Sequence, residues 1–172
     1  MSVLHPFTRG NAPLHVAFYR GRDHGNWLDR AIARHDDGLY SHVELVFGPR
    51  PRIGRARCFS SSYRDGGVRF KSIALGGGPA RKWDLLLLTP PVADVLSLDF
   101  WCKSKVGGNY DVPGVLAFKL PFVRERLGWW FCSEIVAAGL QRLGHLPGER
   151  PASLSPNKLY RKLRKEGRCL PA

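Results

Sequence analysis

Short segments in which apolar and polar residues alternate, or in which a few apolar residues run together, predict the strands of this chain. Alternation with a period of two is typical of a strand with one buried face, and a short apolar run between turn residues is typical of a strand buried on both faces. By these criteria we predict strands at 14–19, 41–47, 57–63, 67–73 and 83–88. Arg64-Asp65-Gly66 predicts a hairpin turn between the third and fourth strands.

Apolar positions three and four residues apart predict helices in other segments. One is predicted at 26–33 with Asn26 as its N-cap, and another at 92–105. A third begins at Cys132 and ends at Gly144, with an apolar stripe on the same side as the cysteine. Ser155-Pro156 predicts the start of a closing helix, because serine caps a helix and proline fits its first position.

Taken together, these elements predict the α+β class, with a mostly antiparallel sheet and the helix that begins at Cys132 packed on it. The chain has 172 residues, which is enough for one domain with a sizeable core and too few for two. We therefore predict a single domain over 1–172, with its core at about 14–165. No apolar run approaches the roughly 20 residues that span a bilayer, so no transmembrane segment is predicted. The first ten residues include Pro6 and lack the apolar region of a signal peptide, which predicts a cytoplasmic protein.

The formal net charge of +13 changes the range of expected partners. Lys and Arg number 27 against 14 acidic residues. Such a surface is attracted to anionic polymers, and both cell-wall polymers and nucleic acid are candidates. The basic residues are spread over several segments, among them 50–57, 81–82 and 161–165, instead of forming one block. This distribution favours nonspecific affinity over dedicated nucleic-acid recognition.

Cys132 is the candidate nucleophile. The four cysteines, at 58, 102, 132 and 169, lack the spacing of a disulfide framework or of a metal site, so free thiols are predicted and neither a metal nor a cofactor. Of these, only Cys132 lies at a predicted helix start, where backbone N–H groups and the helix dipole favour a thiolate. The competing interpretation is that this cysteine is a small buried hydrophobic residue.

His42 is the candidate base, since a cysteine nucleophile needs a base within hydrogen-bond reach and the base needs an orienting partner. Strand residues two apart share a face, so Glu44 is expected beside His42. Its carboxylate would fix the tautomer of the ring and stabilise the imidazolium. Ser60, in the serine-rich segment 60–62, is the alternative third member. The interpretations that involve no catalysis are a structural histidine and a glutamate that either lies on a solvated face or forms a salt bridge with one of the many arginines.

Several motifs together resemble a known family. The segment 41–45 (Ser-His-Val-Glu-Leu) is followed much later by 131–136 (Phe-Cys-Ser-Glu-Ile-Val), with Asn109-Tyr110-Asp111 between them. Gly67-Val68 and Ser155-Pro156 complete the set. This order resembles the circularly permuted papain-like cysteine hydrolases of the NlpC-type superfamily. Their YiiX-like branch also has its histidine strand before its cysteine helix, and lecithin:retinol acyltransferase-like enzymes are more remote members.

The resemblance spans roughly 16–163 and implies a permuted papain-like domain with a Cys-His site. It implies that Tyr110 and Asp111 belong to a loop at the substrate site. The alternative, purely structural interpretation of this loop is a turn in which Asp111 caps backbone amides. One feature departs from the family. Many relatives carry the third catalytic glutamate on the strand after the histidine, where this chain has serines, so the role passes to Glu44 or Ser60. The segment 64–69 and the serine-rich strand also resemble small phage or prophage proteins of this superfamily.

The function expected from this resemblance is hydrolysis of an amide or ester bond, most of all by a cell-wall peptide amidase or peptidase. A lipid acyltransferase or thioesterase of the same fold, acting on a lipid-like acyl substrate, is one alternative. The other is a basic, phage-associated binding protein without activity. Two further locations are considered besides the cytoplasm, namely the virion and the cell envelope. Both fit a cell-wall peptidase and a phage-associated binding protein.

Overall fold

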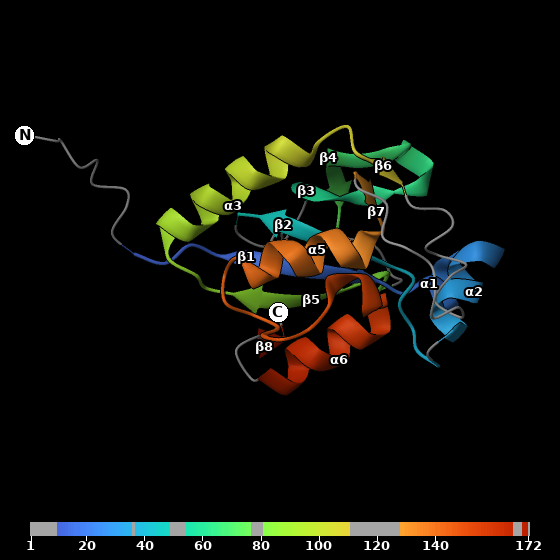
Figure 1. The fold of residues 1–172 in the computed structure, drawn as a ribbon. Helices are drawn as coiled ribbons and strands as arrows, with labels where there is room; N and C mark the ends of the chain where they lie inside the picture. The colour runs from blue at the N-terminus through green and yellow to red at the C-terminus, as the bar shows by residue number, and fades with distance from the viewer. Residues whose placement is uncertain are drawn as a thin grey trace, which may run out of the picture.

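The computed structural model describes residues 10–35, 37–48, 54–76, 81–110, 128–166 and 170–171. One sheet dominates the structure (Figure 1). Its strands are β1 (Leu14–Tyr19), β2 (His42–Phe47), β3 (Arg55–Ser62), β4 (Gly67–Ala74), β5 (Trp83–Leu88), β6 (Asn109–Tyr110), β7 (Trp129–Trp130) and β8 (Leu170–Pro171). They are ordered β7-β6-β4-β3-β2-β1-β5-β8. Neighbouring strands are antiparallel except for the short parallel pair of β6 and β7.

The helices lie against one face and one end of this sheet. They are α1 (Gly21–His24), α2 (Trp27–His35), α3 (Val92–Lys105), α5 (Cys132–Gln141) and α6 (Pro156–Glu166), with short 3-10 turns η2 (Tyr63–Asp65) and η3 (Pro151–Ser153). In Figure 1, α5 lies across the sheet with α3 and α6 on either side of it, while α1 and α2 lie together at one end. α5 packs on β2 and β3, the central strands.

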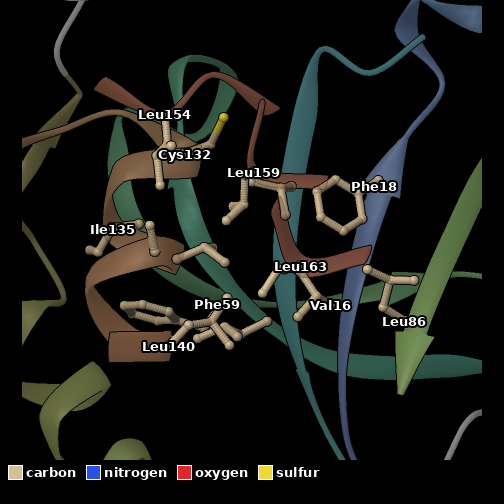
Figure 2. Close-up of a cluster of buried hydrophobic side chains, with 14 of the residues drawn as sticks. Val16, Phe18, Phe59, Leu86, Cys132, Ile135, Leu140, Leu154, Leu159 and Leu163 are labelled. Carbon is tan, nitrogen blue, oxygen red and sulfur yellow. The ribbon is translucent and has the colours of Figure 1, made fainter. Parts of the chain in front are cut away.

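The main core lies between the sheet and these helices (Figure 2). Side chains from α5, α6 and strands β1 to β5 meet there, among them Ile135, Leu140, Leu159, Leu163, Val16, Phe18, Phe59 and Leu86. A smaller apolar cluster covers the opposite face and includes Ala17, Val46 and Cys58. Adjacent strand residues point to opposite faces, so the central strands are buried on both sides. This explains why the segment 83–88 carries an apolar run and no clean alternation.

The predicted α+β class and mostly antiparallel sheet are confirmed. β1, β5 and α3 have the predicted bounds, and α5 begins at Cys132 as predicted. Both predicted caps are present, since the Asn26 side chain accepts a bond from the Asp29 N–H and the Ser155 hydroxyl from the Lys158 N–H. The short elements α1, β6, β7 and β8 were not predicted, because two to four residues are too few to show a period.

Asn157 of α6 fixes the loop that leads into β2. Its Oδ1 accepts a hydrogen bond from the backbone N–H of Tyr40 at 2.9 Å, and its Nδ2 donates to the carbonyl oxygens of Ala33 and Tyr40, both at 3.1 Å. A side chain at Gly38 would not fit, because an added Cβ would lie 2.0 Å from this Oδ1. Since Tyr40 is two residues before His42, the bonds determine where β2 begins.

Three further contacts hold the same loop. The Tyr40 hydroxyl donates to Oδ2 of Asp84 at 2.8 Å, which ties the loop to β5. The Ser41 hydroxyl donates to Oδ1 of Asp29 at 3.0 Å, and the backbone N–H of Ser41 donates to the carbonyl of Tyr19. The residue before His42 is therefore tied to both α2 and β1.

We expect Asn157→Ala to lower the free energy of unfolding by about 2–4 kcal/mol, because it leaves buried backbone groups of Ala33 and Tyr40 without partners. Urea denaturation followed by circular dichroism measures the change. Ser104→Ala is the matched control, since it removes an exposed side-chain bond to the carbonyl of Trp101 and should cost less than about 0.5 kcal/mol. Equal losses in the two variants would contradict the role assigned to Asn157.

Candidate functional site

Cys132 is the first residue of α5, and local contacts fix its position. The backbone N–H of Phe131 donates to Oε2 of Glu134 at 3.2 Å, which is one half of a capping box. The Ser133 hydroxyl donates to the carbonyl of Leu154. Figure 2 shows the Cys132 sulfur at the end of the helix, where the positive end of the helix dipole lies.

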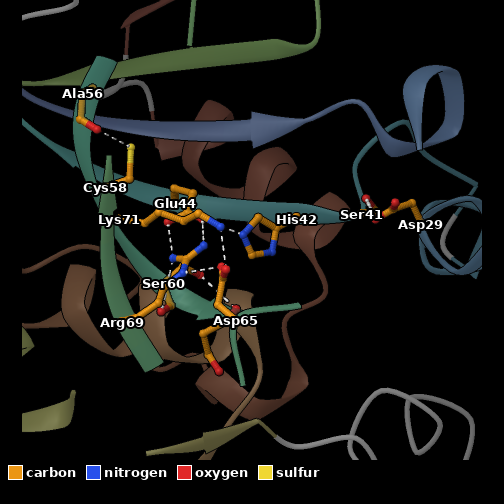
Figure 3. Close-up of polar contacts among 11 residues, drawn as sticks. Asp29, Ser41, His42, Glu44, Ala56, Cys58, Ser60, Asp65, Arg69 and Lys71 are labelled. Carbon is orange, nitrogen blue, oxygen red and sulfur yellow. Dashed lines mark hydrogen bonds and ion pairs between the residues drawn. The ribbon is translucent and has the colours of Figure 1, made fainter. Parts of the chain in front are cut away.

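His42, the first residue of β2, contacts both Cys132 and Glu44. Its Nε2 lies 2.7 Å from Oε1 of Glu44 (Figure 3), and its ring makes a side-chain hydrogen bond with Cys132. Because Nε2 faces the carboxylate, Nδ1 is the nitrogen left for the thiol. The Trp83 ring packs edge-on against the imidazole, with ring centroids 6.4 Å apart. The structure therefore brings together the predicted nucleophile, base and orienting carboxylate.

The environment of His42 favours its charged form. Burial lowers the pKa of His42, but the negative charge of Cys132 and hydrogen bonds to Cys132 and Glu44 outweigh this effect and raise the pKa to about 10. The Cys132 thiol has no exposed surface, whereas 21% of the His42 side chain is exposed. His42 is thus the member of the group that meets solvent.

Glu44 is fully buried and held from two sides. Arg69 of β4 forms a two-point ion pair with it, with Nη2 2.6 Å from Oε1 and Nη1 2.8 Å from Oε2. Burial raises the pKa of Glu44, but the hydrogen bonds and charges of His42 and Arg69 outweigh burial and lower it. Arg69 is held in turn by Asp65, whose Oδ2 lies 2.8 Å from Nε, and Asp65 also pairs with Lys71.

Ser60, the alternative orienting residue, makes different contacts. Its buried hydroxyl donates to the carbonyl of Ser61 at 3.3 Å, and its own carbonyl lies 3.5 Å from Nη1 of Arg69. Of the two candidate orienting residues, it is Glu44 whose carboxylate bonds to His42. The geometry therefore favours Glu44 over Ser60 as the group that orients the ring.

Tyr110 lies beside the start of α5. Its ring centroid is 6.0 Å from that of Phe131, which precedes Cys132, and 6.0 Å from that of Tyr63. Tyr110 therefore lies close to the site, as its motif implied. Asp111 lies outside the described residues, and so does the cysteine at position 169.

The other described cysteines are placed differently. Cys58 and Cys102 are free and fully buried. Burial raises the pKa of Cys58 to about 12 and also raises that of Cys102. Within the described residues, no hydrogen bond joins either thiol to a histidine, so both are expected to be poor nucleophiles at neutral pH.

In the part of the chain that the structure describes, no three His, Cys, Asp or Glu side chains group in a way that would hold a metal ion. Within that same part, no helix has the length and apolar character needed to cross a membrane. No protein-family model matches the sequence, and no curated protein matches it either. The permuted papain-like relationship therefore stays a prediction.

The sequence patterns did not reveal that Arg69 belongs to the site. A signal was available, because Glu44 lies between apolar residues in the middle of a predicted strand, and a carboxylate that is buried there needs a cation. Arg69 and Lys71 share a face of the next hairpin strand. What the sequence does not show is which of the many arginines lies opposite Glu44.

Asp65 is expected to contribute stability that depends on pH. Burial raises the pKa of Asp65, but pairing with Lys71 and Arg69 outweighs it and lowers the pKa to about 2. A carboxyl group whose pKa is lowered by folding stabilises the fold above its ordinary pKa of about 3.9, and this stabilisation disappears as the pH falls towards 2. Asp65→Asn should therefore lower the free energy of unfolding at pH 7 by about 1 kcal/mol after solvent screening, and the difference from wild type should vanish by about pH 2.

Urea denaturation at several pH values measures this difference. Asp37→Asn is the control, because Asp37 pairs with Arg22 on the surface and 98% of its side chain is exposed. The control should match wild type at every pH. A constant difference between Asp65→Asn and wild type from pH 7 to 2 would contradict the assigned ion pairs.

Proposed function

We propose that this chain is a papain-like thiol hydrolase of permuted type that cleaves an amide or ester bond, most of all in a cell-wall peptide. The observation that carries the proposal is that His42 contacts Cys132 on one side and Glu44 on the other. This is the nucleophile-base-orienter arrangement that thiol chemistry requires, recognised by geometry and roles. The family motifs and the +13 charge, which suits an anionic envelope polymer, support the choice of substrate.

In the first half of the reaction, the proton of the Cys132 thiol has passed to His42, whose pKa is raised, and the thiolate sulfur attacks the substrate carbonyl carbon. A carbon–sulfur bond forms, and the carbonyl oxygen takes the negative charge near the backbone N–H of Cys132 at the helix start. When this intermediate collapses, the bond to the amine or alcohol breaks and the His42 imidazolium donates its proton to the leaving group. The product on the protein is an acyl thioester.

In the second half, His42 takes a proton from water, whose oxygen attacks the thioester carbonyl. The carbon–sulfur bond breaks, the acid leaves, and Cys132 is restored. Glu44 accepts the Nε2 hydrogen bond throughout, which keeps Nδ1 directed at the sulfur and stabilises the imidazolium.

Cys132 should be the most reactive thiol of the protein. With iodoacetamide at pH 6, we expect it to be alkylated at least about tenfold faster than Cys58 and Cys102, because it is paired with a protonated histidine and they are not. His42→Ala should slow alkylation of Cys132 by about tenfold or more. Peptide mass spectrometry of samples quenched over time measures the rate at each thiol.

His145→Gln is the matched control for this measurement. His145 also contacts a carboxylate, with Nδ1 2.8 Å from Oε2 of Glu166, but it belongs to the α5–α6 connection and not to the site. This variant should leave the rate at Cys132 unchanged. Equal rates at all thiols would contradict the enzyme proposal, and an inert Cys132 combined with strongly salt-dependent DNA binding would favour a basic binding protein.

The choice of substrate is tested with peptidoglycan fragments and lipid esters. We expect release of a free amine from peptide-containing fragments by wild type, with at least about a thousandfold loss in Cys132→Ser, because an alcohol is a far weaker nucleophile than a thiolate in this setting. Mass spectrometry of the products measures both outcomes. Cleavage of lipid esters alone, or transfer of the acyl group to an added amine, would replace the peptidase assignment with the acyltransferase alternative.

A further inference from the structure

A carboxylate without exposed surface lies at the centre of the proposed site. Glu44 is 0% exposed, and an ionised carboxylate in such a position takes up a proton unless cations or donors compensate it. A protonated Glu44 would accept less strongly from the imidazolium of His42. The site therefore needs a cation that holds Glu44 ionised even when His42 loses its proton during the reaction.

Arg69 has the geometry for this task. Its guanidinium holds both carboxylate oxygens of Glu44 at 2.6 and 2.8 Å, and only 14% of its side chain is exposed. A planar guanidinium that holds both oxygens fixes the rotation of a carboxylate as well as its charge. Oε1, which accepts from Arg69, is also the atom that faces Nε2 of His42, so the position of Arg69 sets the direction of that hydrogen bond.

Arg69 is itself fixed by a second carboxylate. Its Nε lies 2.8 Å from Oδ2 of Asp65, and Asp65 pairs with Lys71 (Figure 3). When Cys132 and His42 are both charged, charges alternate along the series Cys132, His42, Glu44, Arg69, Asp65 and Lys71. Each buried member is thus compensated by its neighbours.

We propose that Arg69 is a positioning residue of the thiol site, which acts through Glu44 to hold the carboxylate ionised and directed at His42. This inference rests on the proposed hydrolase function. Arg69 does not contact the reacting atoms, and the negative charge beside His42 comes from Glu44. Its effect is to prevent the protonation and rotation of Glu44.

Within the described residues, the other groups near Glu44 do not provide this compensation. Cys58 of β3 lies close enough for the charge of Glu44 to raise its pKa further, and burial keeps this thiol neutral. Tyr19 of β1 pairs with His42 across the strands, but its hydroxyl donates to the carbonyl of His24. From α5, Cys132 contributes the thiol that His42 contacts. Of the side chains that bond to Glu44 in the described part of the chain, Arg69 is the permanent cation.

The test compares Arg69→Gln, Arg69→Lys and Arg57→Gln with wild type in the rate of Cys132 alkylation between pH 4 and 8. In Arg69→Gln, Glu44 should titrate within this range, so the acid limb should move up by at least about one pH unit, with a rate about tenfold lower at pH 6. Arg69→Lys should lie between this variant and wild type, because an ammonium supplies the charge without the two-point geometry. Arg57→Gln removes an arginine paired with Asp99 at 2.6 Å outside the site and should match wild type.

Titration of the His42 ring by NMR provides a second readout that does not depend on reactivity. Arg69→Gln should change the pH at which the ring loses its proton, because the charge and direction of the Glu44 carboxylate are no longer fixed, and Arg57→Gln should not. A double-mutant cycle with Glu44→Gln separates positioning from general support of the fold. In the Glu44→Gln background, Arg69→Gln should cause no further loss of rate at Cys132, because its effect passes through the carboxylate. If Arg69→Gln alone does not fold, the double variant, which leaves no unpaired charge, and Arg69→Lys still measure the effect.

The outcomes are distinguishable. Unchanged pH profiles and ring titrations in the Arg69 variants, with a reactive Cys132 in wild type, would overturn the role of Arg69 and leave the proposed function standing. Independent, additive losses in the double-mutant cycle would likewise overturn it. A wild-type Cys132 that reacts no faster than Cys58 would overturn the proposed function and, with it, this inference.

Discussion

The buried carboxylate of Glu44 is the constraint on which the candidate site depends. An ionised group without exposed surface must be compensated on every side, and here His42 and Arg69 do this within hydrogen-bond distance. Both partners come from the sheet, His42 from β2 and Arg69 from β4. Since β2, β3 and β4 are neighbouring strands, their register determines whether these side chains meet Glu44. A slip of one residue would turn the Arg69 side chain to the other face and leave Glu44 without its cation.

The same requirement explains how the entry to β2 is built. His42 is the first residue of its strand, where a chain normally frays, yet its ring must meet Glu44 on one side and Cys132 on the other. Asn157, 117 residues away along the chain from Tyr40, replaces the missing strand partners of the preceding loop. α6 therefore contributes to the site through Asn157, and α5, which packs on β2 and β3, places Cys132 against the same strand end.

Features that depend on residues close together in the sequence were predicted, whereas features that depend on contacts between distant segments were not. Strands and helices long enough to show a period were predicted close to their bounds, and the pairing of His42 with Glu44 followed from the two-residue repeat of a strand. Short elements such as β6 and β7 depend on tertiary neighbours and left no pattern. The choice between Glu44 and Ser60 stayed open because their side-chain directions depend on contacts across strands, and Arg69 was missed for the same reason.

The separation of buried and surface charge has a consequence for the proposed chemistry. The chain carries a net charge of +13, yet the charges of the site alternate and nearly cancel when Cys132 and His42 are ionised. Exposed charges are screened within about 8–10 Å at physiological salt, whereas buried pairs are screened much less. Salt should therefore weaken the attraction of an anionic polymer to the surface without changing the balance between Cys132, His42 and Glu44. On this view, the basic surface governs encounter with the substrate, and the ion pairs behind His42 govern the reactivity of the thiol.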